Sequence, residues 1–528
     1  MNPRYLLAAS LFLTACGGGG GGSGDSAGSA IQTVPASVAA SCQQQAVIGA
    51  AANDGLRIAR VSWLQVVDQL ADDQAMLVAE KATRLRVDVV ADSLRNAPAR
   101  RELRIEDPAT GECTLLSMNG PSQVPTRVDE TTLANSFVVD IPPTLMKSGT
   151  RFSLLFDDAS GRSETESALV KRSLAPRITA AVRETLYVVP VSLGGRTGYT
   201  PGDSAQLAGL LTRLHPVSAV NIIQTAPFTP SGILSAAATA LGNGLNFNGT
   251  LSDMQSLLNA VDDYCQTLAQ GNRAALSPKC LGVFPDQLLF RPAGSTNSLY
   301  TGLAFVGGIT MVTQSFNRVD VMSVSSPYLS SHWIDDRALT VAHEYGHLLD
   351  LDHAACGGAT GTDPRLYGDG RLNAGSGFDA VRGVFFSAAG RTSEFADLMS
   401  YCGKEWTSDR GYLASLNYRS GARVASRETG GSANWVKLTP TETGWRLTPV
   451  AFPPATLETS DAMVTLHSAS GAEDMAPQQA VISDSTEPEN RPLYLNFGAR
   501  EMTQLVMHAH GKRREQRWTP MDWLRTGG

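Results

Sequence analysis

Three of the eight histidines of this 528-residue chain lie close together, at positions 343, 347 and 353. His343, Glu344 and His347 form the pattern H-E-x-x-H. The surrounding stretch lacks proline, and Asp335 or Asp336 can cap its start, so it predicts a helix. Residues four apart share a helix face, so both imidazoles can bind one metal ion, and neutral imidazole suits Zn²⁺. Glu344 is placed to reach a water molecule at that metal without being a ligand itself.

A zinc site of this kind needs a third protein ligand. His353, ten residues after His343, is the first candidate. Asp350 and Asp352 are the nearby alternatives. A more distant carboxylate such as Glu394 would make the site a different kind of zinc site.

The extended pattern H-E-x-x-H-x5-H resembles that of the metzincin zinc endopeptidases, H-E-x-x-H-x-x-G-x-x-H. In that family the glycine ends the helix in a sharp turn that swings the third histidine back to the metal. This chain has Asp350 at the glycine position, which is a departure from the family pattern. Aspartate is among the few residues that tolerate left-handed backbone geometry, so Asp350 is expected to make the same turn.

A second match lies at Met399-Ser400-Tyr401, which is similar to the methionine turn of the astacin and serralysin branches. There the methionine lies beneath the zinc, and the tyrosine hydroxyl contacts the zinc or the reaction intermediate. The resemblance covers roughly residues 184–423, and its specific motifs lie between Ala342 and Cys402. It implies an α+β catalytic domain with a twisted mixed sheet, an active-site helix, this Met-turn and a C-terminal helix from Ser408.

The resemblance implies a zinc-dependent endopeptidase in which Glu344 is the general base and Tyr401 assists. Its partner is then a protein or peptide substrate, aligned by strand addition to an edge strand for which residues 302–312 are the candidate. Two alternatives remain open. One is a catalytically inactive, zinc-stabilised surface adhesin or binding module, and the other is a zincin outside the metzincins that uses Glu394.

The first residues read as a targeting segment. Arg4 is followed by an apolar run, and Leu13-Thr14-Ala15-Cys16 resembles the bacterial lipobox, in which the cysteine carries a lipid. Residues 1–16 are therefore expected to be a signal peptide and residues 17–30 a Gly/Ser-rich tether. This predicts a protein of the bacterial cell envelope, anchored by lipid to the outer membrane or released outside the cell. The lipid would be its only contact with the membrane.

Beyond Cys16, six cysteines remain, an even number that suits an oxidising compartment. Pairing them in order along the chain predicts three disulfides: Cys42–Cys113, Cys265–Cys280 and Cys356–Cys402. The last of these would tie the loop of the third ligand to the Met-turn.

The remaining chain is expected to form three folded parts: a β-sandwich-like domain at 31–179, the zinc peptidase domain at 180–423 and a C-terminal β-domain at 424–528. The stretch Thr83–Ser93 alternates apolar and charged residues, which predicts a half-buried strand. Ser252 is the expected N-cap of a helix that follows it. Trp435 and Trp445 are either a ligand-stacking face or, as we favour, core residues.

The overall composition excludes some classes of protein. The formal net charge is −7 and 42% of the residues are hydrophobic, as in soluble globular proteins. The charge is the opposite of the basic footprint that a nucleic-acid-binding protein needs. We expect no nucleic-acid partner and a monomer.

Overall fold

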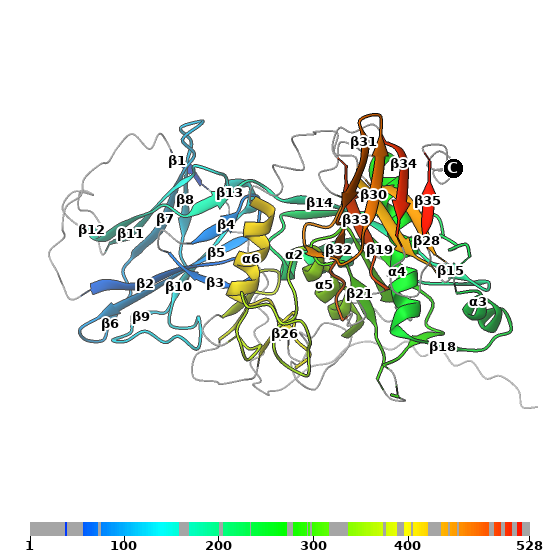
Figure 1. Ribbon diagram of the computed structural model, residues 1–528. Helices are drawn as coiled ribbons and strands as arrows, with labels where there is room; N and C mark the ends of the chain where they lie inside the picture. The colour runs from blue at the N-terminus through cyan, green and yellow to red at the C-terminus, as the bar shows by residue number, and fades with distance from the viewer. Residues whose placement is uncertain are drawn as a thin grey trace, which may run out of the picture. The chain divides into compact units, whose positions relative to one another are not determined.

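The computed structural model describes most of the chain between residues 37 and 519 (Figure 1). The described residues are 37–39, 56–71, 75–157, 168–199, 204–232, 234–271, 278–292, 294–295, 298–315, 336–372, 376–387, 395–402, 405–420, 435–441, 444–450, 453–484, 490–497, 502–508 and 515–519. The predicted lipid site Cys16, the tether 17–30 and Cys42 lie outside them. The described part mixes helices and strands, which confirms the α+β class.

The described residues up to 179 form strands in two main sheets around one hydrophobic core. One sheet has the order β1-β8-β7-β11-β12 and the other β10-β5-β2-β3. Two pairs, β13-β4 and β6-β9, complete this part. The elements are β1 (Ser37–Ala39), β2 (Leu56–Leu64), β3 (Asp68–Leu70), β4 (Met76–Val78), β5 (Thr83–Ala91), β6 (Arg95–Asn96), β7 (Arg100–Glu106), β8 (Cys113–Ser117), β9 (Gln123–Val124), β10 (Phe137–Ile141), the 3-10 helix η1 (Pro143–Leu145), β11 (Arg151–Asp157), β12 (Ala168–Leu174) and β13 (Arg177–Thr179).

The prediction that β5 is half-buried is wrong, because its charged face is buried as well. Arg86 and Asp88 are only 0% and 3% exposed. Their guanidinium and carboxylate pair at 3.1 Å, and the Arg86 guanidinium lies 5.4 Å from the ring centre of Phe385. A neighbouring part of the chain therefore covers this face, and the buried charges compensate one another.

The central part of the chain is built on a five-stranded sheet of order β17-β14-β19-β22-β21. The first four strands run parallel, and β21 joins β22 antiparallel at the edge. The elements of this part are β14 (Arg183–Pro190), β15 (Ser192–Leu193), β16 (Arg196–Thr197), α2 (Ser204–Leu214), β17 (Ala219–Gln224), α3 (Ser235–Gly242), β18 (Phe247–Gly249), α4 (Leu251–Gly271), β19 (Lys279–Phe284), β20 (Leu288–Phe290), β21 (Gly302–Ala304), β22 (Thr310–Gln314), α5 (Asp336–Leu348), β23 (Gly377–Asp379), β24 (Val384–Phe386), β25 (Ala396–Asp397), β26 (Glu405–Trp406) and α6 (Asp409–Ser420).

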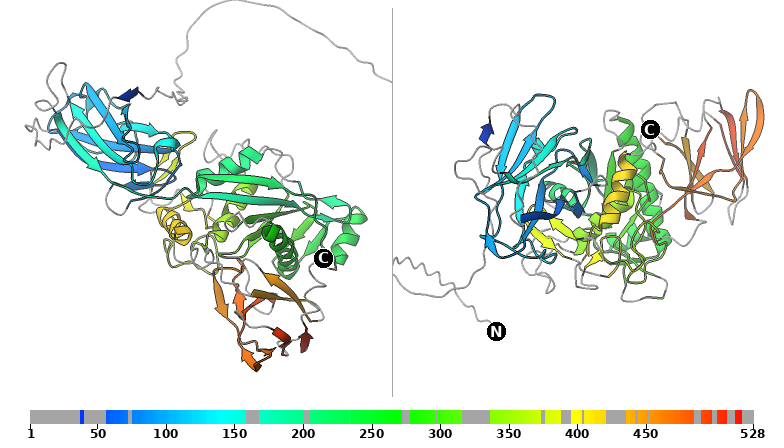
Figure 2. Two further views of the ribbon diagram at one scale, coloured as in Figure 1. Left: turned by 90° about the horizontal axis from the view of Figure 1, so that it is seen from above. Right: turned by 90° about the vertical axis from the view of Figure 1, so that its left-hand side faces the viewer.

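Both faces of this sheet are covered by helices, as can be followed in Figures 1 and 2. Leu186 and Val188 of β14 point into a core shared with α2 and α5. Tyr187 and Val189, the alternate residues, point into a second core shared with α3 and α4. A strand with two buried faces reads as a continuous apolar run, and β14 has that character.

Local sequence explains where several of these elements begin and end. The predicted edge strand 302–312 forms two strands, of which β21 is the edge and β22 lies inside the sheet. The predicted cap Ser252 is wrong: Thr250 caps α4, through a reciprocal pair of hydrogen bonds with Asp253.

The start of α6 is as expected, because the Ser408 hydroxyl accepts a hydrogen bond from the Gly411 amide.

The described residues from 435 onward are strands in two further sheets, of order β28-β27-β33-β32-β29 and β31-β30-β34-β35. Trp445 is 3% exposed in the core between them, and Trp435 packs against the core around α4. The expectation of a sandwich-core residue is confirmed for Trp445, whereas Trp435 is half-buried and packs against the central part of the chain. None of the described helices has the length and apolar character needed to cross a membrane. The strands are β27 (Trp435–Pro440), β28 (Trp445–Val450), β29 (Leu457–Thr459), β30 (Val464–Ser468), β31 (Gly471–Met475), β32 (Gln478–Ala480), β33 (Leu493–Asn496), β34 (Met502–Met507) and β35 (Gln516–Trp518).

One fully buried lysine fastens helix α5 to the sheet. The Lys279 ammonium, on β19, donates hydrogen bonds to the carbonyl oxygens of Leu348, at 2.8 Å, and Gly308, at 2.7 Å. The Leu348 carbonyl is one of those at the end of α5 that have no partner within the helix. A cation there also matches the negative end of the helix dipole. Lys279 thus fixes the end of α5 from which the chain turns toward residue 353.

We predict that Lys279→Met lowers the free energy of unfolding by about 2 kcal/mol or more, because two buried carbonyl groups lose their donor. Urea denaturation, followed by tryptophan fluorescence, measures this change. The control is Lys147→Met, since Lys147 pairs with Asp107 at the surface. An unchanged denaturation midpoint for Lys279→Met would show that α5 does not depend on this anchor.

Candidate metal centre

Helix α5 presents His343 and His347 on one buried face. The two side chains follow one another by one turn, and their ring centres are 4.9 Å apart. They are 6% and 0% exposed. Tyr345, between them in sequence, points into the core of the sheet, where it packs against His215. The helix therefore divides its residues between a core face and a polar site.

The helix ends in a Schellman motif with Asp350 in the left-handed position. The Leu351 amide donates to the Gly346 carbonyl at 3.2 Å, and the Asp350 amide donates to the His347 carbonyl at 2.9 Å. Asp350 has φ = 68°. The sequence-based expectation that Asp350 makes the turn otherwise made by glycine is confirmed.

The Asp350 carboxylate is held away from the histidines. One oxygen accepts a hydrogen bond from Arg365 at 3.1 Å and the other accepts one from the Thr456 hydroxyl. Arg365 is in turn paired with Asp363 at 2.7 Å. Asp350 is therefore wrong as an alternative metal ligand, and its side chain instead fixes the turn.

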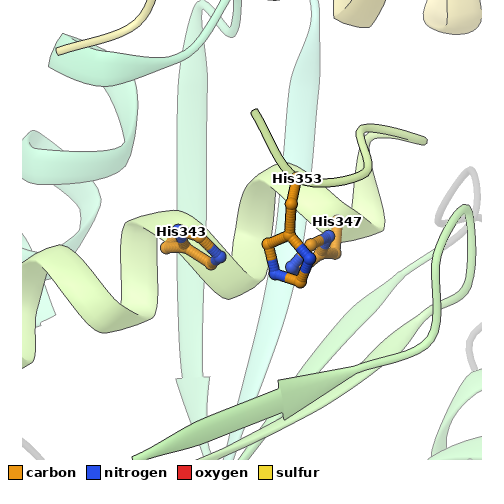
Figure 3. Close-up of side chains that lie close together, drawn as sticks. All are labelled: His343, His347 and His353. Atoms are coloured by element: carbon orange, nitrogen blue, oxygen red, sulfur yellow. The ribbon is translucent and has the colours of Figure 1, made fainter. Parts of the chain in front are cut away.

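The turn brings His353 back to the helical pair, as Figure 3 shows. One potential ligand atom from each of the three rings lies within 4.8 Å of the others. His353 is fully buried, and its ring centre is 4.7 Å from that of His347. Asp352 accepts a hydrogen bond from the His353 amide instead of joining the cluster, and Glu394 lies outside the described residues.

Backbone carbonyl groups orient all three rings. The Nδ1 atoms of His343, His347 and His353 lie 2.8, 2.8 and 2.9 Å from the carbonyl oxygens of Leu398, Leu351 and Thr360. A carbonyl oxygen only accepts, so each Nδ1 carries a proton, and Nε2 presents a lone pair whenever the ring is neutral. A metal-binding histidine commonly has this arrangement, because the hydrogen bond at Nδ1 fixes both tautomer and ring orientation.

The lone pairs of the helical histidines have no partner among the described residues. Nε2 of His343 and Nε2 of His347 are buried, and neither forms a hydrogen bond within this part of the chain. Burial lowers the pKa of His343 to about 3 and that of His347 well below its usual range, so both rings are neutral at neutral pH. Buried acceptors without a donor are costly, and a bound cation would satisfy them. The residues fit a metal ion.

Met399 lies directly beneath the helix. Its sulfur is so close to Gly346 that a β-carbon at that position would approach it to 2.4 Å. The side chain is fully buried. The turn that carries it is held by the buried Asp397, whose carboxylate accepts a hydrogen bond from the Met399 amide at 2.8 Å. Burial raises the pKa of Asp397 to about 6. The predicted Met-turn therefore packs against the histidine helix.

The Met-turn and the loop of the third histidine are joined side by side. The Ala354 amide donates to the Met399 carbonyl at 2.8 Å, and the Tyr401 amide donates to the Cys356 carbonyl at 3.2 Å. The predicted disulfide Cys356–Cys402 is present next to these hydrogen bonds, with 5.7 Å between the α-carbons. His353 is thus positioned by a covalently closed pair of loops.

The second predicted disulfide, Cys265–Cys280, is also present and joins α4 to β19. Cys113 is disulfide-bonded, but its predicted partner Cys42 lies outside the described residues, so that pairing stays a prediction.

Glu344 is buried at the edge of the sheet. Gly302 of β21 lies so close that a β-carbon there would approach the Glu344 carboxylate to 2.3 Å. The Ser483 hydroxyl lies 3.4 Å from the other carboxylate oxygen. Burial first, and then the charge of Asp484, raise the pKa of Glu344 well above its usual range. A bound divalent cation would act in the opposite direction and favour the ionised carboxylate.

Tyr401 lies over the histidines, with its hydroxyl 2.8 Å from Nε2 of His353. The hydroxyl also donates to a carboxylate oxygen of Asp484 at 2.7 Å. Although 43% of the residue is exposed, desolvation, followed by the Asp484 charge, raises the pKa of the phenol, so it remains a hydrogen-bond donor.

Sequence reasoning did not find Ser483 or Asp484. They follow the centre by more than 80 residues and belong to a stretch without a recognisable motif. No local periodicity or spacing connects them to the histidines, so only the three-dimensional fold could reveal them.

No protein-family model matches this chain, and no curated protein matches it either.

We predict that Asp350→Ala unfolds at lower urea concentration than Asp350→Gly, with a difference of about 1 kcal/mol. Both variants lose the bonds to Arg365 and Thr456, so the difference isolates the cost of a β-carbon at positive φ. Equal stabilities would mean that the turn relaxes to another conformation. Urea denaturation of the two variants, side by side, measures the difference.

We predict that replacing both Cys356 and Cys402 by alanine weakens binding of a divalent metal ion about tenfold or more, because the loop of His353 loses its covalent support. Replacing Cys265 and Cys280 is the matched control, which removes a disulfide without touching these loops. Chelator competition measures both. Equal metal affinity in the two double variants would contradict a role of the 356–402 bridge in positioning the third ligand.

Proposed function

We propose that this protein is a zinc-dependent endopeptidase of the metzincin type. The observation that carries the proposal is the convergence of three buried imidazoles at residues 343, 347 and 353, with the buried carboxylate of Glu344 next to them. The Met-turn packed beneath the helix and the tyrosine above the rings agree with the sequence resemblance.

Zinc is the metal that this donor set favours. Three imidazole nitrogens and no thiolate or clustered carboxylate in the described triad suit Zn²⁺, and a triad of protein ligands leaves a coordination position for chemistry. His343, His347 and His353 would hold the ion through Nε2.

When bound, zinc would act as a Lewis acid that polarises a carbonyl group and makes water more acidic. Glu344 would accept the proton of the attacking water and pass it to the leaving amine. Tyr401 would donate its hydroxyl hydrogen to the oxyanion that forms at the carbonyl oxygen. The burial of Glu344 excludes bulk water and strengthens both interactions.

The substrate would be a protein or peptide in extended form. Strand β21 is the edge of the central sheet, and its residue Gly302 lies against Glu344. A peptide that pairs with this edge would carry its backbone past the general base. The predicted lipid anchor would place this activity at the bacterial cell envelope.

One observation favours the alternative of a catalytically inactive, zinc-stabilised module. Glu344 and Tyr401 both contact the chain's own residues, Ser483 and Asp484. If these contacts are permanent, the zinc site stabilises the fold and hydrolyses nothing. The two functions differ in whether removal of the Glu344 carboxylate has a catalytic consequence.

We predict that Glu344→Gln keeps one zinc ion per chain and lowers the rate of peptide-bond hydrolysis by about 100-fold or more, because the general base is lost. Peptide-library cleavage with zinc-loaded protein, analysed by mass spectrometry, measures turnover, and metal analysis measures zinc. His353→Ala is the metal control and should lose zinc, whereas His467→Ala, on β30, should lose neither. Equal cleavage by wild type and Glu344→Gln would overturn the proposed mechanism.

A further inference from the structure

We propose that residues Val481–Asp484 occupy, from within the chain, the place along the edge of β21 where a substrate would pair, which we call the substrate cleft, with the Asp484 carboxylate as a fourth ligand of the metal. This inference rests on the proposed function, because it assigns an occupant to the same cleft. In this proposal, the observed conformation is a resting state in which the chain's own segment closes the substrate cleft.

The backbone of this segment follows the edge strand as a peptide substrate would. Phe305 and Ile482 form an antiparallel bridge, and the Val306 amide donates to the Val481 carbonyl at 3.1 Å. The Ser483 amide donates to the Ala304 carbonyl at 2.9 Å. The other edge of β21 pairs with β22, so these bonds use the edge that a substrate would need.

The side chains of the segment engage the catalytic groups. Ser483 is 2% exposed, and its hydroxyl accepts a hydrogen bond from the Ala304 amide at 2.9 Å while lying 3.4 Å from the Glu344 carboxylate. Asp484 follows with φ = 58°. This left-handed turn, which aspartate tolerates better than most residues, carries its carboxylate to Tyr401 and His353.

The Asp484 carboxylate lies next to one of the three histidines, although it is outside the group whose ligand atoms are all within 4.8 Å of one another. Its oxygen lies 3.8 Å from Nε2 of His353, and its side chain is 15% exposed. With zinc–ligand bonds of about 2 Å, neighbouring ligand atoms of a tetrahedral site are about 3.3 Å apart. A movement of this carboxylate toward His343 and His347 would complete a four-ligand site.

The excess of hydrogen-bond acceptors over donors in the cleft also favours a bound cation. The three Nε2 atoms converge here, the Asp484 oxygen lies 3.8 Å from that of His353, and the Tyr401 hydroxyl has one hydrogen to share between His353 and Asp484. Acceptors thus outnumber donors. A divalent ion would satisfy the surplus and balance the negative charges of Asp484 and Glu344, whereas neutral imidazoles balance none of it.

The test compares zinc affinity and peptide hydrolysis in the full chain. Asp484→Asn keeps the size of the side chain and the tolerance of positive φ, whereas Asp484→Ala removes the ligand outright. Asp474→Asn, on the exposed strand β31, is the matched control. Chelator competition with Zn²⁺ measures affinity, and circular dichroism confirms folding.

We expect both Asp484 variants to bind zinc about tenfold or more weakly than wild type, because one of four ligands is lost. At saturating zinc, we expect them to hydrolyse peptides at least tenfold faster than wild type, because the segment loses its bond to the metal and a substrate displaces it more easily from the edge of β21. The control should match wild type in both measurements.

The outcomes separate the two proposals. Unchanged zinc affinity in both variants overturns the role of Asp484, while hydrolysis that depends on Glu344 would still support the endopeptidase. Weaker zinc binding without hydrolysis in any variant supports Asp484 as a ligand and overturns the endopeptidase. Hydrolysis by Asp484→Asn that disappears in the double variant with Glu344→Gln supports both.

Discussion

Three hydrogen bonds from ring nitrogens to backbone carbonyl oxygens determine the chemistry of this site. The acceptors lie on three different segments: Leu398 before the Met-turn, Leu351 in the helix-ending turn and Thr360 in the following loop. Each bond fixes one ring in the neutral tautomer, with its lone pair turned inward. If any of these segments moved, a nitrogen would turn away or change its proton. Much of the surrounding structure can be understood as holding these carbonyl groups in place.

Because these carbonyl groups must stay in place, several independent interactions support the segments that carry them. The helix is fastened by a buried lysine, its end is held in a left-handed turn by Arg365 and Thr456, and the two loops beyond it are bonded to one another. Burying two nitrogen acceptors without a donor costs free energy in the metal-free chain. The cores on both faces of the central sheet and the disulfides offset that cost.

The sequence predicted this centre well because its information is local. The spacing of the histidines, the turn at Asp350 and the order Met399–Tyr401 all lie within one stretch of the chain, where helix geometry and residue conformation decide the outcome. The cap of α4 was predicted two residues too late, because serine and threonine are both good caps. The buried charged face of β5 was missed, because strand periodicity describes one sheet and not what packs against its other face.

Asp484 shows the other limit of local reasoning. Its carboxylate reaches His353 and Tyr401 only because the chain at the end of β21 pairs with residues far along the sequence, and no periodic signal encodes such a pairing. Yet an aspartate beside Glu344 is unfavourable unless a positive charge lies between them. The same cation that would satisfy the imidazoles would therefore also hold this segment in the cleft. Metal binding and closure of the cleft are then one thermodynamic event, in which each strengthens the other by the same free energy.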